Sequence, residues 1–151
     1  MEDVDYHKRL KKLKLYSLER RRDRYLIIYG WQQIENIKEN VMKLKTNWRG
    51  LGRRIISRAI PTQVEGRRLK RAEITSIHNS PARRVERAFN CIPNHLRNMT
   101  GISTESFKAN LDKWLREVPD QPKCGQYAKW VAARSNAIQD QAANLRRGYT
   151  G

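Results

Sequence analysis

The chain has 151 residues, the usual size of a single domain, and its 32 lysines and arginines greatly outnumber its 15 aspartates and glutamates. The formal net charge of +17 and the mean hydropathy of -0.86 favour polyanionic partners over plain solvation of a basic surface. Two cysteines are too few for a disulfide framework, and the longest apolar cluster, residues 25–29, is far shorter than the roughly 20 residues that cross a bilayer, so we expect an intracellular protein without a membrane span.

The first predicted element is a short basic helix over residues 6–15. Tyr6, Leu10 and Leu13 recur at spacings of four and three and form one apolar stripe, while lysines occupy the remaining surface. This pattern is typical of an amphipathic helix with a cationic outer face.

A second, longer helix is predicted from its N-cap, Ser17, to about Leu44. Its middle should be buried, because residues 25–29 are apolar all round. Gly30 lies in the helix interior at a cost of about 1 kcal/mol relative to alanine, which indicates close packing against another backbone or a local bend. The residues expected on the buried face are Ile27, Trp31, Ile34, Ile37, Val41 and Leu44.

The two N-terminal helices carry the main predicted binding surface. Joined by a short bend, they would present their cations to successive phosphates of a nucleic-acid strand. Such phosphate contacts hold the strand without reading its sequence. The alternatives are a polybasic address signal, a membrane-surface patch or plain solvation. Tyr16, Tyr25 and Tyr29 could stack on unpaired bases, although their helical spacing favours a core position. The predicted contacts are Lys8, Arg9, Lys11, Lys12, Lys14, Arg20, Arg21, Arg22 and Arg24.

Residues 46–79 are predicted to form a basic connector. Glycines and Pro61 interrupt the helical periodicity, so we expect a loop-rich or disordered segment that becomes ordered on a partner. Residues 53–60 and 72–78 each contain isoleucines and could instead pair as a short β-hairpin. The connector holds the second group of predicted nucleic-acid contacts: Arg67, Arg68, Lys70 and Arg71.

Helical patterns return in residues 80–151. Ser80 and Pro81 open a helix that Pro93 ends, and Ser103 caps another helix. A last helix is expected over residues 127–146, with a thin apolar face formed by Trp130, Val131, Ala133, Ala137 and Ile138.

The predicted fold is therefore mainly α, with one or more small helical domains. The expected divisions are residues 1–45, 46–79 and 80–151. The helices are expected to pack through Trp31, Ile34, Phe89, Phe107, Leu111 and Trp114.

No catalytic or metal centre is recognisable in the sequence. Cys91 and His95 have helical spacing, but a zinc site needs about four ligands and the other thiol, Cys124, is distant in sequence. The acidic residues are scattered rather than clustered as in metal-dependent polymerases and nucleases. Glycine-rich phosphate loops are also absent from the sequence. We therefore expect neither a cofactor nor enzymatic activity from the chain alone.

Two stretches of the sequence resemble one known family. The first, residues 9–37, reads RLKKLKLYSLERRRDRYLIIYGWQQIENI; the second, residues 80–140, includes SPARRVERAFNCIPNHLRNMTG, FKANLDKWLREVPDQP and ARSNAIQD. In the same order, they resemble the C-terminal, post-palm region of reverse transcriptases from jockey-like non-LTR retrotransposons. Gly30 replaces a bulky residue of that pattern, and Cys91 replaces a small polar one.

The resemblance implies thumb-like helices and a terminal extension that grip an RNA or RNA–DNA template–primer behind the active site. The catalytic aspartates and their magnesium would belong to the parent polymerase, in the palm upstream of the matching segments. The family also implies a location in the nucleus and cytoplasm. One alternative is a protein-interaction module that docks onto the palm through the apolar faces of residues 103–147. Another is the product of a truncated element copy that has no selected role.

Overall fold

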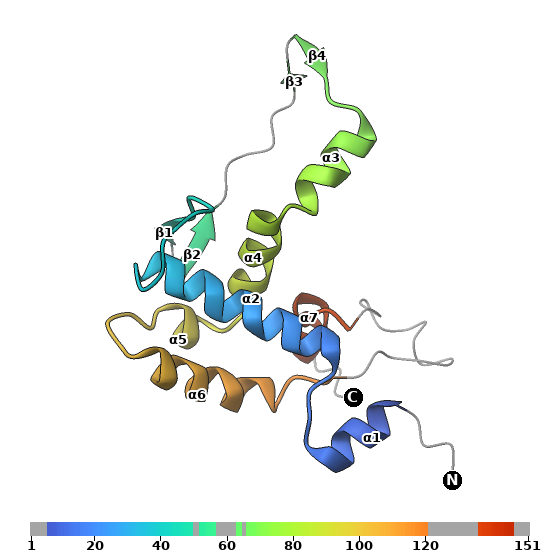
Figure 1. Ribbon diagram of the computed structural model, residues 1–151, viewed down its shortest axis with the longest axis vertical. Coiled ribbons are helices and arrows are strands. Elements are labelled where there is room, and N and C mark those ends of the chain that lie inside the picture. The colour runs from blue at the N-terminus through green and yellow to red at the C-terminus, as the bar shows by residue number, and fades with distance from the viewer. Residues whose placement is uncertain (1–5, 50–51, 57–62, 65, 121–135, 147–151) are drawn as a thin grey trace.

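The computed structural model describes residues 6–49, 52–56, 63–64, 66–120 and 136–146 (Figure 1). Within these ranges the prediction of a mainly α fold with a short β-hairpin is confirmed. The elements in chain order are α1 (Tyr6–Leu13), α2 (Leu18–Ile34), β1 (Lys45–Arg49), β2 (Gly52–Ile56), β3 (Gln63–Val64), β4 (Arg67–Arg68), α3 (Arg71–His78), α4 (Pro81–Asn90), α5 (Asn94–Arg97), α6 (Thr104–Leu115) and α7 (Ile138–Arg146).

Helix α2 is the central element and begins where the sequence predicts. The Ser17 hydroxyl accepts a hydrogen bond from the Arg20 N–H, 3.2 Å away, and satisfies one of the unpaired donors of the first turn. In Figure 1, α2 passes between α4 and α6, and it packs against both.

The predicted extension of α2 to Leu44 is wrong. The helix stops at Ile34, and Asn36 takes a left-handed conformation with φ of 60°. Helical spacing continues through Ile37 and Val41, but both side chains are exposed, while Leu44 still reaches the core. The periodicity was misleading because these three residues belong to a loop.

One core joins the three sequence segments that were predicted as separate regions. The rings of Trp31 and Phe107 stack in parallel with centroids 4.5 Å apart. Around them pack Phe89, Leu111 and, from the hairpin, Ile55. Of the six residues predicted to hold the helices together, Ile34 is partly buried and the other five are buried.

Gly30 is a point of close packing between α2 and α4. A Cβ atom at this position would lie 2.6 Å from Cγ1 of Val85 and 3.3 Å from Cδ1 of Ile55. The first distance is below any van der Waals contact, so the missing methyl group is what lets the two helices approach. Close packing at Gly30 is thus confirmed, but the atoms that approach it belong to side chains and not, as predicted, to another backbone.

The hairpin is present, but with a different partner strand. Strand β2 pairs antiparallel with β1, so that Trp48 lies opposite Arg53, whereas residues 71–78 form α3 rather than a strand. A short local connection costs less closure entropy than the predicted pairing of 53–60 with 72–78. The described part of residues 46–79 holds more regular structure than the predicted loop-rich connector, because it contains most of β1, all of β2 to β4, and α3.

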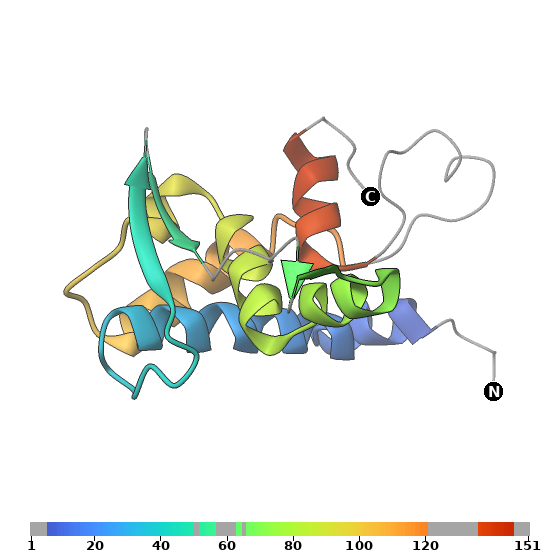
Figure 2. The same ribbon diagram turned by 90° about the horizontal axis from the view of Figure 1, so that it is seen from above.

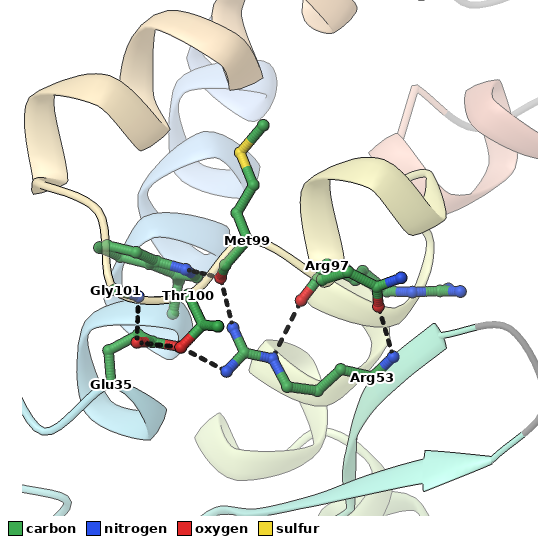
Figure 3. A network of polar contacts seen from close by, with 8 residues as sticks. Glu35, Arg53, Arg97, Met99, Thr100 and Gly101 are labelled. Carbon is green, nitrogen blue, oxygen red and sulfur yellow. Dashed lines mark hydrogen bonds and ion pairs between the residues drawn. The ribbon is translucent and has the colours of Figure 1, made fainter.

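A buried polar network fastens this hairpin to the helices (Figure 3). The Arg53 guanidinium donates to the carbonyl oxygens of Arg97, at 2.9 Å, and Met99, at 2.8 Å, and forms an ion pair with Glu35. Glu35 also accepts hydrogen bonds from the Thr100 hydroxyl, 2.8 Å away, and the Gly101 N–H, 3.3 Å away. The network holds the end of α2, the hairpin and the loop before α6 in one arrangement.

Two of the remaining helices, α4 and α6, begin where the sequence predicts. Helix α4 begins at Pro81, and the Ser103 hydroxyl caps α6 by accepting from the Ser106 N–H at 3.2 Å. Helix α7 packs against α4, on the side away from the hairpin in Figure 2. The last helix was predicted over residues 127–146, but Asn136 and Ala137 are not helical and α7 begins at Ile138. Residues 127–135, with Trp130, Val131 and Ala133, lie outside the described residues. Across the ranges described, no helix combines the length and apolarity needed to cross a membrane.

Candidate nucleic-acid interface

Helix α1 presents its cations on the side opposite Leu10. Leu10 is its buried apolar residue, whereas Tyr6 and Leu13 are exposed. Lys8 and Lys12 lie two residues before and after Leu10, which places them about opposite it at 100° per residue. All five predicted contacts of this segment are exposed: Lys8, Arg9, Lys11, Lys12 and Lys14.

Arg20 does not belong to the binding surface, and that prediction is wrong. Its side chain is fully buried and donates to the carbonyl oxygens of Val118, at 3.3 Å, and Pro119, at 2.6 Å. Burial lowers the pKa of Arg20, although the nearby carboxylates of Asp120 and Asp23 oppose that change. Arg20 thus anchors α2 to the segment after α6.

Replacing Arg20 with methionine should therefore affect stability rather than binding. We expect the free energy of unfolding to fall by about 2 kcal/mol, because two buried carbonyl groups lose a charged donor. Urea denaturation measures this change, and a titration with oligonucleotide should show little change in affinity. Arg22→Met is the matched control for stability alone, since Arg22 is an exposed cation on the same helix but lines the tyrosine groove described below. A stable Arg20→Met variant with weakened binding would contradict the assignment.

Arg24 is partly neutralised by an acidic partner. Its Nε and one terminal nitrogen donate to the two carboxylate oxygens of Asp112, at 2.8 and 3.0 Å. This hydrogen bonding raises the pKa of Arg24. Arg21 and Arg22 are exposed, and Arg21 uses its Nε to donate to the Tyr16 carbonyl at 3.0 Å. Of the four α2 arginines predicted as contacts, Arg21 and Arg22 are therefore exposed, whereas Arg24 is paired with Asp112 and Arg20 is buried.

A shallow groove between α2 and α4 brings cations together around an exposed tyrosine. We call it the tyrosine groove; it has a volume of about 430 Å³. No acidic residue is among the described residues that line it, which are Arg21, Arg22, Tyr25, Leu26 and Arg84. Sequence reasoning placed Tyr25 in the core, yet 61% of its surface is exposed.

Arg84 is a candidate contact that the sequence analysis missed. It lies on α4, remote in sequence from α2, and reaches the tyrosine groove because Val85, its neighbour, packs where Gly30 leaves space. The sequence holds only a weak signal for this position of Arg84. Helical spacing places it at the edge of the apolar face formed by Val85, Ala88 and Phe89.

A second groove lies on another side of α2, beside the end of α1 and the end of α6. Its volume is about 900 Å³. Arg116, a second missed cation, enters it from the residue after α6, and Arg21 borders both grooves. The lining contains four cations and one acid: Lys14, Arg21, Arg24, Arg116 and Asp112, with Leu15 and Tyr16. The two grooves thus form one cationic region around Arg21.

The second predicted group of contacts lies elsewhere. Arg67, Arg68, Lys70 and Arg71 are exposed, but β4 and the start of α3 project to the end of the molecule farthest from α1 (Figure 1). Arg67 donates to Glu73 at 2.8 and 3.0 Å, and this hydrogen bonding lowers the pKa of Glu73 to about 2. The fold therefore keeps the two predicted basic groups apart.

The described residues contain no group of three or more His, Cys, Asp or Glu side chains that could hold a metal ion. Cys91 is buried, and burial raises its pKa to about 12. Its Sγ donates to the Ala88 carbonyl at 2.9 Å, whereas His95 is exposed. Cys124 lies outside the described residues.

Comparisons of the chain with protein-family models, with curated proteins and with solved structures each return no match. The chemistry of the two grooves is therefore the basis on which a function can be assigned.

Proposed function

We propose that this chain binds nucleic acid through its phosphate backbone, using the region formed by the tyrosine groove and its neighbour. The observation that carries the proposal is the gathering of Arg21, Arg22 and Arg84 around Tyr25 with no acid among the described lining residues. Guanidinium groups bind phosphates in a bidentate manner, and the net charge of +17 attracts a polyanion over a longer range.

Helix α1 extends this surface. Its exposed lysines supply mobile point charges that neutralise phosphates without demanding one geometry. A strand seated on Arg21, which borders both grooves, would find cations on either side. We consequently expect the affinity to depend strongly on salt concentration and weakly on the nucleotide sequence.

The resemblance to retrotransposon reverse transcriptases adds a context to this proposal. In that context the chain corresponds to thumb-like helices and a C-terminal extension, and its ligand is a template–primer or the element RNA. The palm, with its aspartates and magnesium, lies upstream of the matching segments in that family. Incubation of the chain alone with primer, template, magnesium and nucleotides is expected to yield no extension.

Docking onto a protein such as the polymerase palm is the second candidate. It is favoured by the exposed leucines around the bend between α1 and α2, namely Leu13, Leu15 and Leu18. The earlier form of this alternative, through the apolar faces of residues 103–147, is disfavoured because Phe107, Leu111 and Leu115 are already buried in the core. Hydrophobic docking would respond little to salt.

A salt titration of oligonucleotide binding tests the proposal. The variant carrying Arg21→Gln, Arg22→Gln and Arg84→Gln should bind about 10- to 100-fold more weakly at moderate salt, because three phosphate contacts are lost. The slope of log affinity against log salt should fall in magnitude by about 2 to 3.

The matched control removes the same charge elsewhere. Lys43, Lys45 and Lys113 are exposed outside both grooves, and their replacement by glutamine should change affinity and slope much less. Equal losses in the two triple variants would show that net charge alone attracts the strand. A salt-independent affinity of the unaltered chain would overturn the proposal in favour of docking.

A further inference from the structure

The exposed side of α2 carries aromatic rings in an ordered arrangement. Tyr25 and Tyr29 are stacked one helical turn apart, with centroids separated by 5.7 Å and planes inclined by 9°. The Lys38 ammonium lies over the Tyr29 ring, 5.9 Å from its centroid. Tyr29 is thus flanked by a ring and a cation, whereas Tyr25 borders the open tyrosine groove.

The position of Tyr25 follows from the geometry of the helix. Ile27 and Trp31 point into the core, and Tyr25 lies about 200° around the helix from Ile27. Stacking on Tyr29 holds the ring of Tyr25 parallel to its neighbour even though most of it is in water. A flat, oriented and solvated aromatic surface therefore stands next to a group of cations.

Arg21 and Arg22 precede Tyr25 by four and three residues and lie one turn away on the same side of α2. Arg84 comes from α4 and completes the groove. Charged groups are thus supplied by two different elements around one ring. This combination of a stacking surface with adjacent cations is the one that unpaired nucleotides require.

We propose that the tyrosine groove holds an unpaired nucleobase stacked on Tyr25, with the adjoining phosphates on Arg21, Arg22 and Arg84. This inference rests on the proposed binding of nucleic acid and specifies its ligand as a single-stranded segment or an unpaired strand end. Inside a duplex both faces of each base are covered by neighbouring pairs. A continuous duplex can therefore meet the arginines but cannot use the tyrosine.

The test compares a single-stranded oligonucleotide with a hairpin of the same length, whose stem is fully paired and whose loop is a non-nucleotide linker, using the full chain. Each probe carries one 2-aminopurine, whose fluorescence falls when the base stacks on a ring. The single strand should bind about tenfold or more tightly than the hairpin at equal salt, and its fluorescence should be quenched on binding.

Variants at position 25 separate the ring from the charges. Tyr25→Ser should remove the quenching and weaken single-strand binding about tenfold, while Tyr25→Phe, which keeps the ring, should retain both. Trp48→Ser is the matched control, because Trp48 is also an exposed aromatic residue but lies on strand β1 of the protein, away from the tyrosine groove. Circular dichroism of each variant confirms that the helices remain.

The possible outcomes separate the stacking of a base on Tyr25 from the proposed binding of nucleic acid in general. Failure of both probes to bind at low salt would overturn nucleic-acid binding as a whole, and with it the stacked base. Equal affinity for the single strand and the hairpin, unchanged by Tyr25→Ser, would leave the proposed function intact and overturn only the stacking. Displacement of the single strand by polyglutamate at equal charge concentration would show that the groove takes acidic peptides instead.

Discussion

Replacing Arg53 with alanine is expected to lower the free energy of unfolding by about 3 to 5 kcal/mol, because the carboxylate of Glu35 would lose its buried counter-ion. The side chains of both residues are almost completely buried, at 5% and 10% exposure. The carbonyl oxygen of Arg97 would lose its donor in the same step, and that of Met99 would keep only the hydrogen bond from Trp31 Nε1. The hairpin would then lose its main polar attachment to the helices.

Chemical denaturation followed by far-ultraviolet circular dichroism measures this loss. Arg54→Ala is the matched control, since Arg54 is the next residue of β2 but is exposed, and its removal should change stability by less than about 0.5 kcal/mol. Similar losses in the two variants would contradict the network. Arg53→Lys should be intermediate, because an ammonium group cannot reproduce the planar fork of guanidinium donors.

The same network should become weaker in acid. Burial opposes ionisation of Glu35, but hydrogen bonds from Arg53, Thr100 and Gly101 outweigh it, so the pKa of Glu35 lies below its usual value. A carboxyl group whose pKa is depressed by folding stabilises the protein above its unfolded pKa, and this contribution is lost as the pH falls through the folded pKa. The difference in stability between the unaltered chain and Arg53→Ala should narrow over that acidic range.

Trp31→Ala is expected to be at least as damaging, with a loss of about 3 to 5 kcal/mol from the free energy of unfolding. The side chain is fully buried, and its Nε1 donates to the Met99 carbonyl at 3.0 Å. Truncation would leave a cavity between α2 and α6, and the stacked face of Phe107 would lose its partner. The same denaturation experiment gives the magnitude.

A double-mutant cycle separates the stacking of the two rings from simple loss of volume. Trp31→Ala and Phe107→Ala should show a coupling of about 0.5 to 1.5 kcal/mol, the range found for aromatic pairs. Trp48→Ala serves as a control for tryptophan removal at an exposed site, with an expected loss of about 1 kcal/mol or less. Strict additivity of the two core substitutions would contradict the stacking.

Local signals predicted the starts of helices well. Ser17, Ser103 and the Ser80–Pro81 pair each mark a helix start that the structure contains, because capping depends on residues that are neighbours in sequence. The buried residues Trp31, Phe89 and Phe107 were also identified from spacing alone.

Features that depend on distant partners could not be predicted in this way. The end of α2 is determined by Glu35, whose carboxylate is held by Arg53 and the loop before α6. The strands of the hairpin place the charged Arg53 on a buried position, so they lack the usual alternation of apolar and polar residues.

The candidate site shows the same division. The exposed cations of α1, together with Arg21 and Arg22, could be predicted from the basic composition of this segment. The burial of Arg20 could not, because it depends on carbonyl groups almost a hundred residues away in sequence. Arg84 and Arg116 join the surface only because the fold returns α4 and the end of α6 to α2. Tertiary contacts thus decide which arginines of a basic run face a ligand.

The spacing of the cations around the tyrosine groove depends on packing in the hydrophobic interior. Gly30 permits Val85 to approach α2, and Arg84 is adjacent to Val85 on the same helix. Any side chain at position 30 would require Val85 or α4 to shift, and would thereby change the distance between Arg84 and the arginines of α2. Under the proposed function, a single added methyl group in the interior would then alter affinity although no ligand touches it.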